Sequence, residues 1–211
     1  THDAIYQIRV MDIVANNKTS TGSAFVIDSN GLIAANYHVV SSAVNTANKY
    51  RIELLQNDES VVYIANVVNV DVVSDLAPLQ VKDLGAPVLT LAESAMAQGD
   101  TAYAIGFTYD LGVTVVPGTY NGLAPHSASG RVHFTGSLNP GMSGGPALNT
   151  LGEVIGINVA SAGNQVSFLI PIARLQALYA TTPLDQERDL KDTMRQQLIN
   201  NSDRMIDQML N

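Results

Sequence analysis

The stretch GMSGGPAL, at residues 141–148, decides how this chain is interpreted. It sets one serine among three glycines, just before an apolar run that is typical of a strand. Glycine tolerates positive φ, so the backbone can turn sharply here and another molecule can come close to the main chain. A nucleophilic serine needs both, because its Oγ must project into a cleft and nearby N–H groups must point at the oxygen that becomes negative. Ser143 is therefore a candidate nucleophile.

The order of residues along the chain separates two interpretations of this motif. The motif also fits G-x-S-x-G, the nucleophile elbow of α/β-hydrolases, in which the histidine of the triad follows the serine. All four histidines of this chain (His2, His38, His126 and His133) precede Ser143. An α/β-hydrolase triad cannot be completed, whereas the order His, Asp, Ser of chymotrypsin-type enzymes remains open.

A candidate general base follows a predicted hairpin. The segment TGSAFVIDSNGLIAANYHVV, residues 21–40, holds two short apolar runs on either side of DSNG, which is a strong hairpin signal. His38 falls just after the second run, where residues 39–43 can begin a helical turn. A lone histidine there can simply pack at a strand end, but together with the Ser143 motif it predicts a catalytic base.

Two aspartates compete for the role of the acid. Asp75 stands immediately before an apolar strand in DVVSDLAPLQV, residues 71–81, and Asp71 opens the same segment. Either can cap a turn between strands, which is a common role of Asp at such a place. The spacing favours Asp75 only weakly.

Four segments of the chain together resemble a known family. The segments at 21–40, SDLAPLQV at 74–81, NPGMSGGPAL at 139–148 and LGEVIGINVA at 151–160 resemble, in this order, the protease domain of the HtrA/Deg family. That family belongs to the chymotrypsin-like serine peptidases, and the resemblance covers residues 20–175.

The resemblance implies a fold and a set of roles. It implies an all-β chain of two six-stranded antiparallel barrels, with His38 and Asp75 on the first barrel and Ser143 on the second. His38 is then the general base, Asp75 its orienting carboxylate and Ser143 the nucleophile. The backbone N–H groups of Gly141 and Ser143 are the expected oxyanion donors.

The chain departs from the family in three places. Residues 176–211 are too few for the peptide-binding PDZ domain that usually follows the protease domain, and the segment before Ser20 is short. Met142 stands where digestive relatives carry an aspartate that pairs with a newly cut N-terminus. We therefore expect no PDZ domain and no zymogen switch of that kind.

The same resemblance places the specificity pocket. Ser137, six residues before the nucleophile, is expected at the base of the pocket, and Asn158, Val159 and Ala160 are expected in its wall. No carboxylate lies between Arg131 and Leu151. A buried Lys or Arg side chain would lack a partner there, so we predict cleavage after small or medium aliphatic residues.

Short Val/Ile-rich segments, separated by Gly, Asn, Asp and Pro, continue to Pro171 and predict an all-β structure. We expect the first barrel in residues 1–83, the second in 84–175 and a helical extension in 176–211. Residues 172–179 predict a short helix that leads into the extension. TPLD at 182–185 predicts the start of an amphipathic helix. We expect that helix to break around NNS, residues 200–202, and to pack on the barrels or to contact another copy or a partner.

Composition limits the function further. Hydrophobic residues make up 46% of the 211 residues, and 11 basic against 19 acidic side chains give a formal net charge of −8. This charge disfavours nucleic-acid binding, and no apolar run is long enough for a membrane span. The absence of cysteine excludes disulfides, thiol catalysis and Cys-based zinc sites. We expect neither a cofactor nor a metal, and no metal role for His126 or His133. We expect peptides or unfolded proteins as substrates. The expected location is periplasmic or secreted, in a bacterial cell envelope.

These observations predict a serine endopeptidase. Two alternatives stay open: a latent or regulatory protein on the same fold that needs a partner, and an esterase that uses the same triad.

Overall fold

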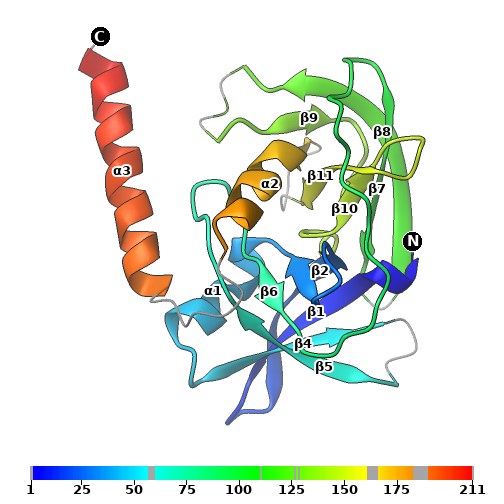
Figure 1. Ribbon diagram of the computed structural model, residues 1–211, viewed down its shortest axis with the longest axis vertical. Helices are drawn as coiled ribbons and strands as arrows, with labels where there is room; N and C mark the ends of the chain where they lie inside the picture. The colour runs from blue at the N-terminus through cyan, green and yellow to red at the C-terminus, as the bar shows by residue number, and fades with distance from the viewer. Residues whose placement is uncertain are drawn as a thin grey trace.

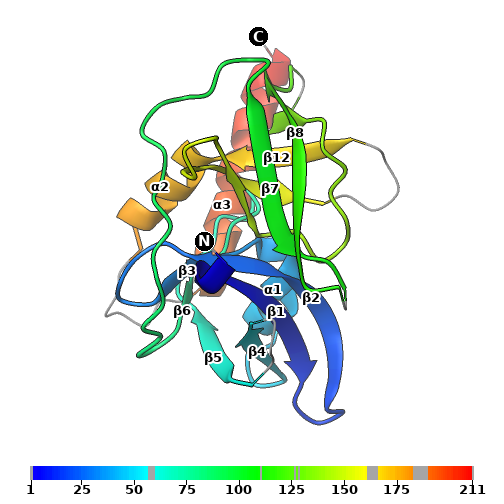
Figure 2. The same ribbon diagram turned by 90° about the vertical axis from the view of Figure 1, so that its right-hand side faces the viewer.

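The computed structural model describes residues 2–56, 60–109, 111–125, 127, 129–160, 166–182 and 190–210. Within these residues two closed antiparallel barrels form, each from six strands, as predicted. The first barrel lies below the second in Figure 2, and the long C-terminal helix stands beside both in Figure 1.

The first barrel takes the strands in the order β1-β2-β3-β6-β5-β4. Their bounds are β1 Ile5–Asp12, β2 Asn17–Val26, β3 Leu32–Ala34, β4 Tyr50–Leu55, β5 Val62–Val67 and β6 Leu79–Gln80, with the short 3-10 helix η1 (His2–Ala4) before β1 and the helix α1 (Tyr37–Asn45) between β3 and β4. The predicted hairpin joins β2 to β3, which pair with Phe25 opposite Ala34. Asp28 Oδ1 accepts the N–H groups of Asn30 and Leu32 at 2.8 and 3.0 Å, so the turn carries its own hydrogen bonds.

The second barrel takes the order β10-β11-β12-β9-β8-β7. Its strands are β7 Thr101–Phe107, β8 Val113–Leu123, β9 Val132–Phe134, β10 Pro146–Leu148, β11 Val154–Val159 and β12 Ser167–Pro171. Two helices follow, α2 (Ile172–Ala180) and α3 (Leu190–Leu210). The short helix that we predicted after Pro171 is confirmed.

Three groups of buried side chains hold this arrangement together. One fills the first barrel and includes Ile8 and Leu54. Another fills the second barrel around Phe134 and Met142. The third lies between the barrels and includes Phe25, Ile157 and the α2 residue Leu175. This third core fixes one barrel against the other, because burial of apolar surface favours their contact.

The expected break in the C-terminal helix is wrong. Helix α3 runs without interruption from Leu190 to Leu210. Residues 200–202 contain neither Gly nor Pro, so each keeps its backbone N–H for the helical ladder. Side-chain bonds along the helix also support it, with Gln196 Nε2 donating to Asn200 Oδ1 at 2.9 Å. The predicted start signal at Pro183 and Asp185 lies outside the described residues.

No helix in the described part of the chain is long and apolar enough to cross a membrane.

Candidate active site

His38 and Asp75 form a tightly joined pair. His38 is the second residue of α1, and Asp75 lies in the loop between β5 and β6. The ring nitrogen His38 Nδ1 is 2.7 Å from Asp75 Oδ2, and the backbone N–H of His38 donates to Asp75 Oδ1 at 2.8 Å. One carboxylate thus holds both the backbone and the ring of the histidine. About half of the His38 side chain (47%) is exposed to solvent.

The backbone of Asp75 is also fixed from several sides. Its carbonyl accepts the N–H of Tyr37 at 3.1 Å and the side-chain amide of Asn36 at 3.0 Å. Asn36, the N-cap residue of α1, makes no side-chain cap bond, so Asp75 satisfies the first free N–H groups of this helix in its place. Asp75 has φ +62°, a left-handed conformation that L residues rarely adopt. Such a conformation persists where the surroundings hold it.

The rival aspartate has a different role in the structure. Asp71 Oδ1 accepts the N–H of Ser74 at 2.9 Å. The backbones of Asp71 and Leu76 exchange hydrogen bonds of 2.8 and 2.9 Å. Asp71 therefore closes the turn that presents Asp75.

Ser143 is buried at the junction of the barrels. Its side chain lies in the loop before β10, its residue exposure is 5%, and its Oγ accepts the N–H of Ala160 at 3.1 Å. Its carbonyl accepts the N–H of Ser23 on β2 at 2.7 Å. Ser143 and His38 both belong to the described residues, and no hydrogen bond joins them in this structure.

A glycine brings the two halves of the site close to each other. A Cβ built on Gly22 would lie 2.7 Å from Val39 Cγ1 and 3.1 Å from the carbonyl oxygen of Ser143. Val39 follows His38 in α1, so the absence of a side chain at position 22 lets the histidine segment and the serine loop meet. In enzyme structures without substrate, catalytic hydrogen bonds are often long and tighten when substrate binds.

The backbone before Ser143 forms a tight turn at Gly141. The N–H of Met142 donates to the carbonyl of Asn139 at 3.1 Å, and Gly141 has φ +96°. Pro at the second place and Gly with positive φ at the third make this a type II turn. A Cβ on Gly141 would lie 2.6 Å from the carbonyl oxygen of Phe107. Among the described residues, the N–H groups of Gly141 and Ser143 have no hydrogen-bond acceptor.

Ser23 is a residue of the site that sequence reasoning missed. Its fully buried hydroxyl donates to the carbonyl of Gly141 at 2.7 Å and accepts the N–H of Phe107 at 2.8 Å. It thereby ties the first barrel to the turn that carries Gly141. The signal in the sequence was a hydroxyl inside the apolar run after Gly22, since a buried hydroxyl is normally hydrogen-bonded.

Arg131 was also missed, and no sequence pattern indicated it. It lies just before β9 of the second barrel, and its Nη2 is 4.0 Å from Asp75 Oδ2. A positive charge from one barrel therefore faces the carboxylate that the other barrel presents to His38.

The predicted pocket residues fall in different environments. Ser137 is exposed, whereas Val159 is buried. Asn158 is fully buried, and its amide donates to the carbonyl of Ile105 at 2.9 Å. The half-buried residue next to Ser137 is Leu138, which packs on the second-barrel core.

The other histidines do not join the site within the described residues. His133 lies in β9, and His126 falls outside the described part of the chain. The described residues contain no group of three or more His, Cys, Asp or Glu side chains placed to hold a metal ion.

Two barrels that bring His38, Asp75 and Ser143 to their junction define the class of chymotrypsin-like peptidase folds. Comparison with known families agrees: the model of the trypsin-like peptidase domain matches residues 22–157. This chain belongs to the trypsin-like peptidase domain family, and its relatives are serine proteases of the HtrA/Deg group.

Similar proteins support this membership. The putative serine protease HhoA of Synechocystis is 36% identical over 76% of this chain and 42% of its own length. The probable periplasmic serine endoprotease DegP-like protein of Chlamydia trachomatis is 31% identical over 78% of this chain and 33% of its own length. The chain thus spans well under half the length of these curated relatives.

Solved structures share the fold. The serine endoprotease from Yersinia pestis superposes with a TM-score of 0.72 at 26% identity, covering 85% of this chain and 62% of that one. Deg5 superposes with a TM-score of 0.70 at 27% identity, covering 84% of this chain and 87% of that one.

Proposed function

We propose that this chain is a serine endopeptidase that hydrolyses peptide bonds with His38, Asp75 and Ser143. The observation that carries the proposal is the double contact of Asp75 with His38, through the ring at 2.7 Å and the backbone at 2.8 Å. A carboxylate bound in this way fixes the ring orientation and the tautomer that a catalytic histidine needs. The family membership and the named relatives point to the same reaction.

In the proposed mechanism, Ser143 Oγ attacks the carbonyl carbon of the scissile bond while the His38 ring takes its proton. The new C–O bond places negative charge on the carbonyl oxygen, which the N–H groups of Gly141 and Ser143 stabilise. His38 then gives the proton to the leaving amine, and the acyl group stays on Ser143. A water molecule, activated by His38, releases the acyl group and restores the serine. Asp75 stays ionised and stabilises the imidazolium that forms in each half of the reaction.

One hydrogen bond supports the alternative that the protein is latent and needs a partner for activity. Ser143 Oγ accepts a hydrogen bond from Ala160 and none from His38. A partner or substrate that competes for the Ala160 N–H would release Ser143 Oγ to turn toward the ring. Among the described residues, no acceptor binds the N–H groups of Gly141 and Ser143. This supports the active form, because oxyanion donors must be available to the substrate oxygen.

We infer a preference for small or medium aliphatic residues before the cut. The segment from Arg131 to Leu151 has no carboxylate to pair with Lys or Arg. Leu138 and Val159 supply apolar side chains near the nucleophile loop. An aliphatic side chain gains roughly 1.5–3 kcal/mol from complete burial, whereas an unpaired buried charge is strongly unfavourable. A role in the cell envelope follows only from the DegP-like relative, which is named periplasmic.

Peptide profiling tests reaction and specificity together. Digestion of a denatured proteome should yield new termini that follow mainly Val, Ala or Leu, and Ser143→Ala should yield none above background. A dominant preference for Lys or Arg would contradict the proposed pocket. Equal digestion by Ser143→Ala would contradict the proposed nucleophile, and hydrolysis of esters without amides would favour an esterase.

A further inference from the structure

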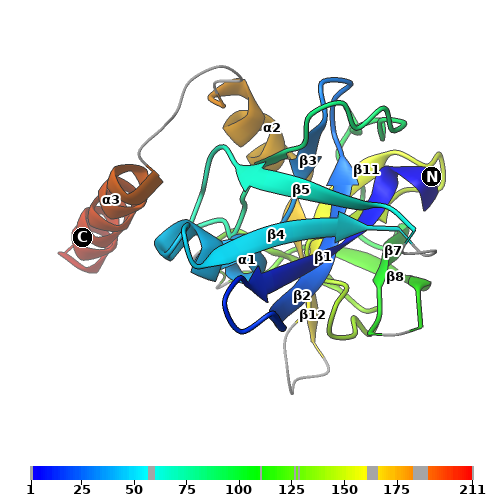
Figure 3. The ribbon, with the colours of Figure 1, turned by 90° about the horizontal axis from the view of Figure 1, so that it is seen from below.

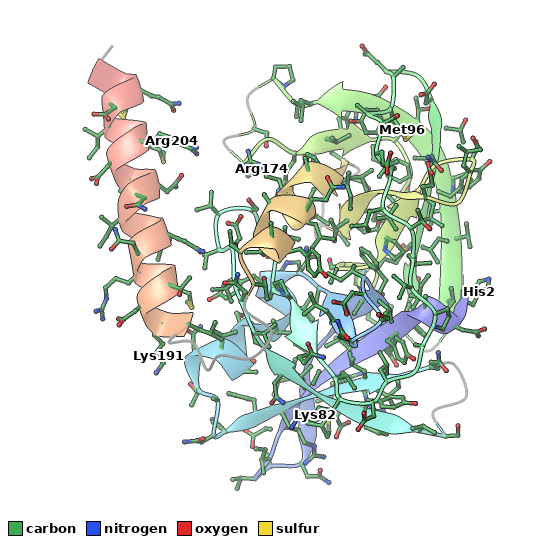
Figure 4. All side chains as sticks on the ribbon, in the orientation of Figure 1. His2, Lys82, Met96, Arg174, Lys191 and Arg204 are labelled. Carbon is green, nitrogen blue, oxygen red and sulfur yellow. The ribbon has the colours of Figure 1, made fainter. Side chains whose placement is uncertain are left out.

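Helix α3 contacts the body of the protein with one face near its N-terminal end. Leu190 and Met194 pack against the first-barrel core. Figure 3 shows the helix beside α1, at one side of the barrels. Further along, a cavity of about 300 Å³, lined by Arg174 of α2 and Arg204 of α3 among others, separates the two helices. Figure 4 shows these two arginines on facing sides of that space. The packing contacts of Leu190 and Met194 thus lie in the first turns of the helix.

Gln197 makes the most specific contact of this face. Its Oε1 accepts the N–H of Val72 at 2.9 Å, and its Nε2 donates to the carbonyl of Val70 at 2.6 Å. The primary amide has one donor side and one acceptor side, so it binds this stretch of backbone as a neighbouring strand would. The two bonds lie on either side of Asp71.

The backbone that Gln197 holds leads directly to Asp75. Asp71 pairs with Leu76 through two backbone bonds, and its carboxylate accepts the N–H of Ser74. Asp75 sits at the end of this closed turn with φ +62°. Because such a conformation is unfavourable in isolation, it depends on the contacts that fix the turn. Gln197 supplies two of those contacts from outside the barrels.

The same helix face also reaches the histidine side of the site. The hydroxyl of Tyr37 donates to Met194 Sδ at 3.9 Å. Tyr37 precedes His38 in α1, and its backbone N–H donates to the carbonyl of Asp75 at 3.1 Å. Residues of α3 thus contact the neighbours of both members of the His38–Asp75 pair.

We propose that Gln197 is a positioning residue of the active site. By holding residues 70–72, it keeps the Asp75 carboxylate in line with His38 Nδ1. The reaction is therefore faster when α3 is docked in this position than when it is not. This inference rests on the proposed function, because it assigns Gln197 to the triad of that function. It gives the C-terminal helix a role in the rate of the reaction without placing any α3 residue in contact with substrate.

Gln197→Ala tests the proposal, with Gln196→Ala as the matched control. Gln196 is the adjacent exposed glutamine, and its side-chain amide donates to Asn200 on the same helix. Gln197→Ala should lower kcat on a peptide substrate by about tenfold with KM little changed, since a misplacement of about 1 Å can cost roughly 10²-fold. Gln196→Ala should match the parent. Gln197→Glu keeps an acceptor for the Val72 N–H and loses the donor to the Val70 carbonyl. Its kcat should therefore lie between that of the parent and that of Gln197→Ala.

A second readout does not depend on activity. The proton between His38 Nδ1 and Asp75 should give a far-downfield NMR signal in the parent and in Gln196→Ala, and a shifted or broadened one in Gln197→Ala. Equal kcat and equal signals for both variants would overturn the proposal. If the parent itself proves inactive while the signal still responds to Gln197→Ala, the proposed function fails and the positioning role stands. A thermal melt of each variant identifies general unfolding. If Gln197→Ala is unfolded, the kcat and the NMR signal of Gln197→Glu test the proposal in its place.

Discussion

At the scale of single residues, the Asp75 carboxylate organises the site. The carboxylate binds the ring and the backbone N–H of His38. The backbone carbonyl of Asp75 accepts the N–H of Tyr37 at the start of α1. The carboxylate also suits this place because negative charge is favourable at a helix N-terminus. One side chain therefore orients the proposed base and completes the helix that carries it.

Asp75→Asn should lower kcat by roughly 10⁴-fold, because the amide favours the wrong tautomer of the imidazole. Asp71→Asn should have a much smaller effect, since an amide oxygen can still accept the Ser74 N–H. Steady-state kinetics of both variants on one peptide substrate measure the difference. The opposite ranking would move the acid to Asp71.

Residues that lie close together in the sequence could be predicted, and residues joined across the chain could not. The glycines around Ser143, the hairpin before His38 and the strand after Asp75 are local signals, and the structure brings these residues to one junction. Ser23 and Gly141 are 118 positions apart, and Gln197 and Val70 are 127 apart. Such contacts depend on how the barrels and α3 pack, which no short motif encodes.

At the scale of elements, the β1–β2 hairpin depends on an ionised side chain. Asp12 Oδ1 accepts the N–H groups of Ala15 and Val14 at 2.9 and 3.0 Å, and Lys49 Nζ is 3.7 Å from Oδ2. The bond from the Ala15 N–H is the largest cause that lowers the pKa of Asp12 below its ordinary value, with smaller contributions from Val14 and Lys49; partial burial opposes them.

Asp12→Ala should therefore destabilise the protein more at neutral pH than in acid. A lowered folded-state pKa stabilises the fold above the unfolded pKa of about 3.9, and this stabilisation is lost as the pH falls through the folded value. Urea unfolding at pH 7 and near pH 3 should show a difference in unfolding free energy between parent and variant that becomes smaller in acid. A difference of constant size would mean that the charge of Asp12 has no role in the hairpin.

Removal of residues 183–211 should leave both barrels folded. The cores between and within the barrels are built mainly from strands, α1 and α2, and α3 adds two partly buried side chains to one of them. Thr182 is kept because its hydroxyl accepts Asn69 Nδ2 at 3.1 Å and donates to Leu178 at 2.8 Å. Circular dichroism should show a cooperative fold, with slower reaction at Ser143. Complete unfolding would make α3 part of the core.

At the scale of the whole molecule, the site exists only where the two barrels meet. The first barrel presents His38 and Asp75, and the second presents Ser143 and Arg131. Ser23 and the core between the barrels fix this junction. We propose residues 1–83 and 84–175 as the two units, with residues 176–211 as an extension whose helix acts on the site from outside.

Covalent labelling with a fluorophosphonate probe, followed by peptide mapping, tests whether Ser143 is an activated nucleophile. Such a probe reacts with a serine whose hydroxyl is activated by a base and whose neighbouring N–H groups stabilise the charge that develops. We predict that the label falls on Ser143, that His38→Ala abolishes it, and that Asp71→Asn leaves it. A chain that is folded and remains unlabelled at Ser143, or that labels equally well without His38, would contradict the account.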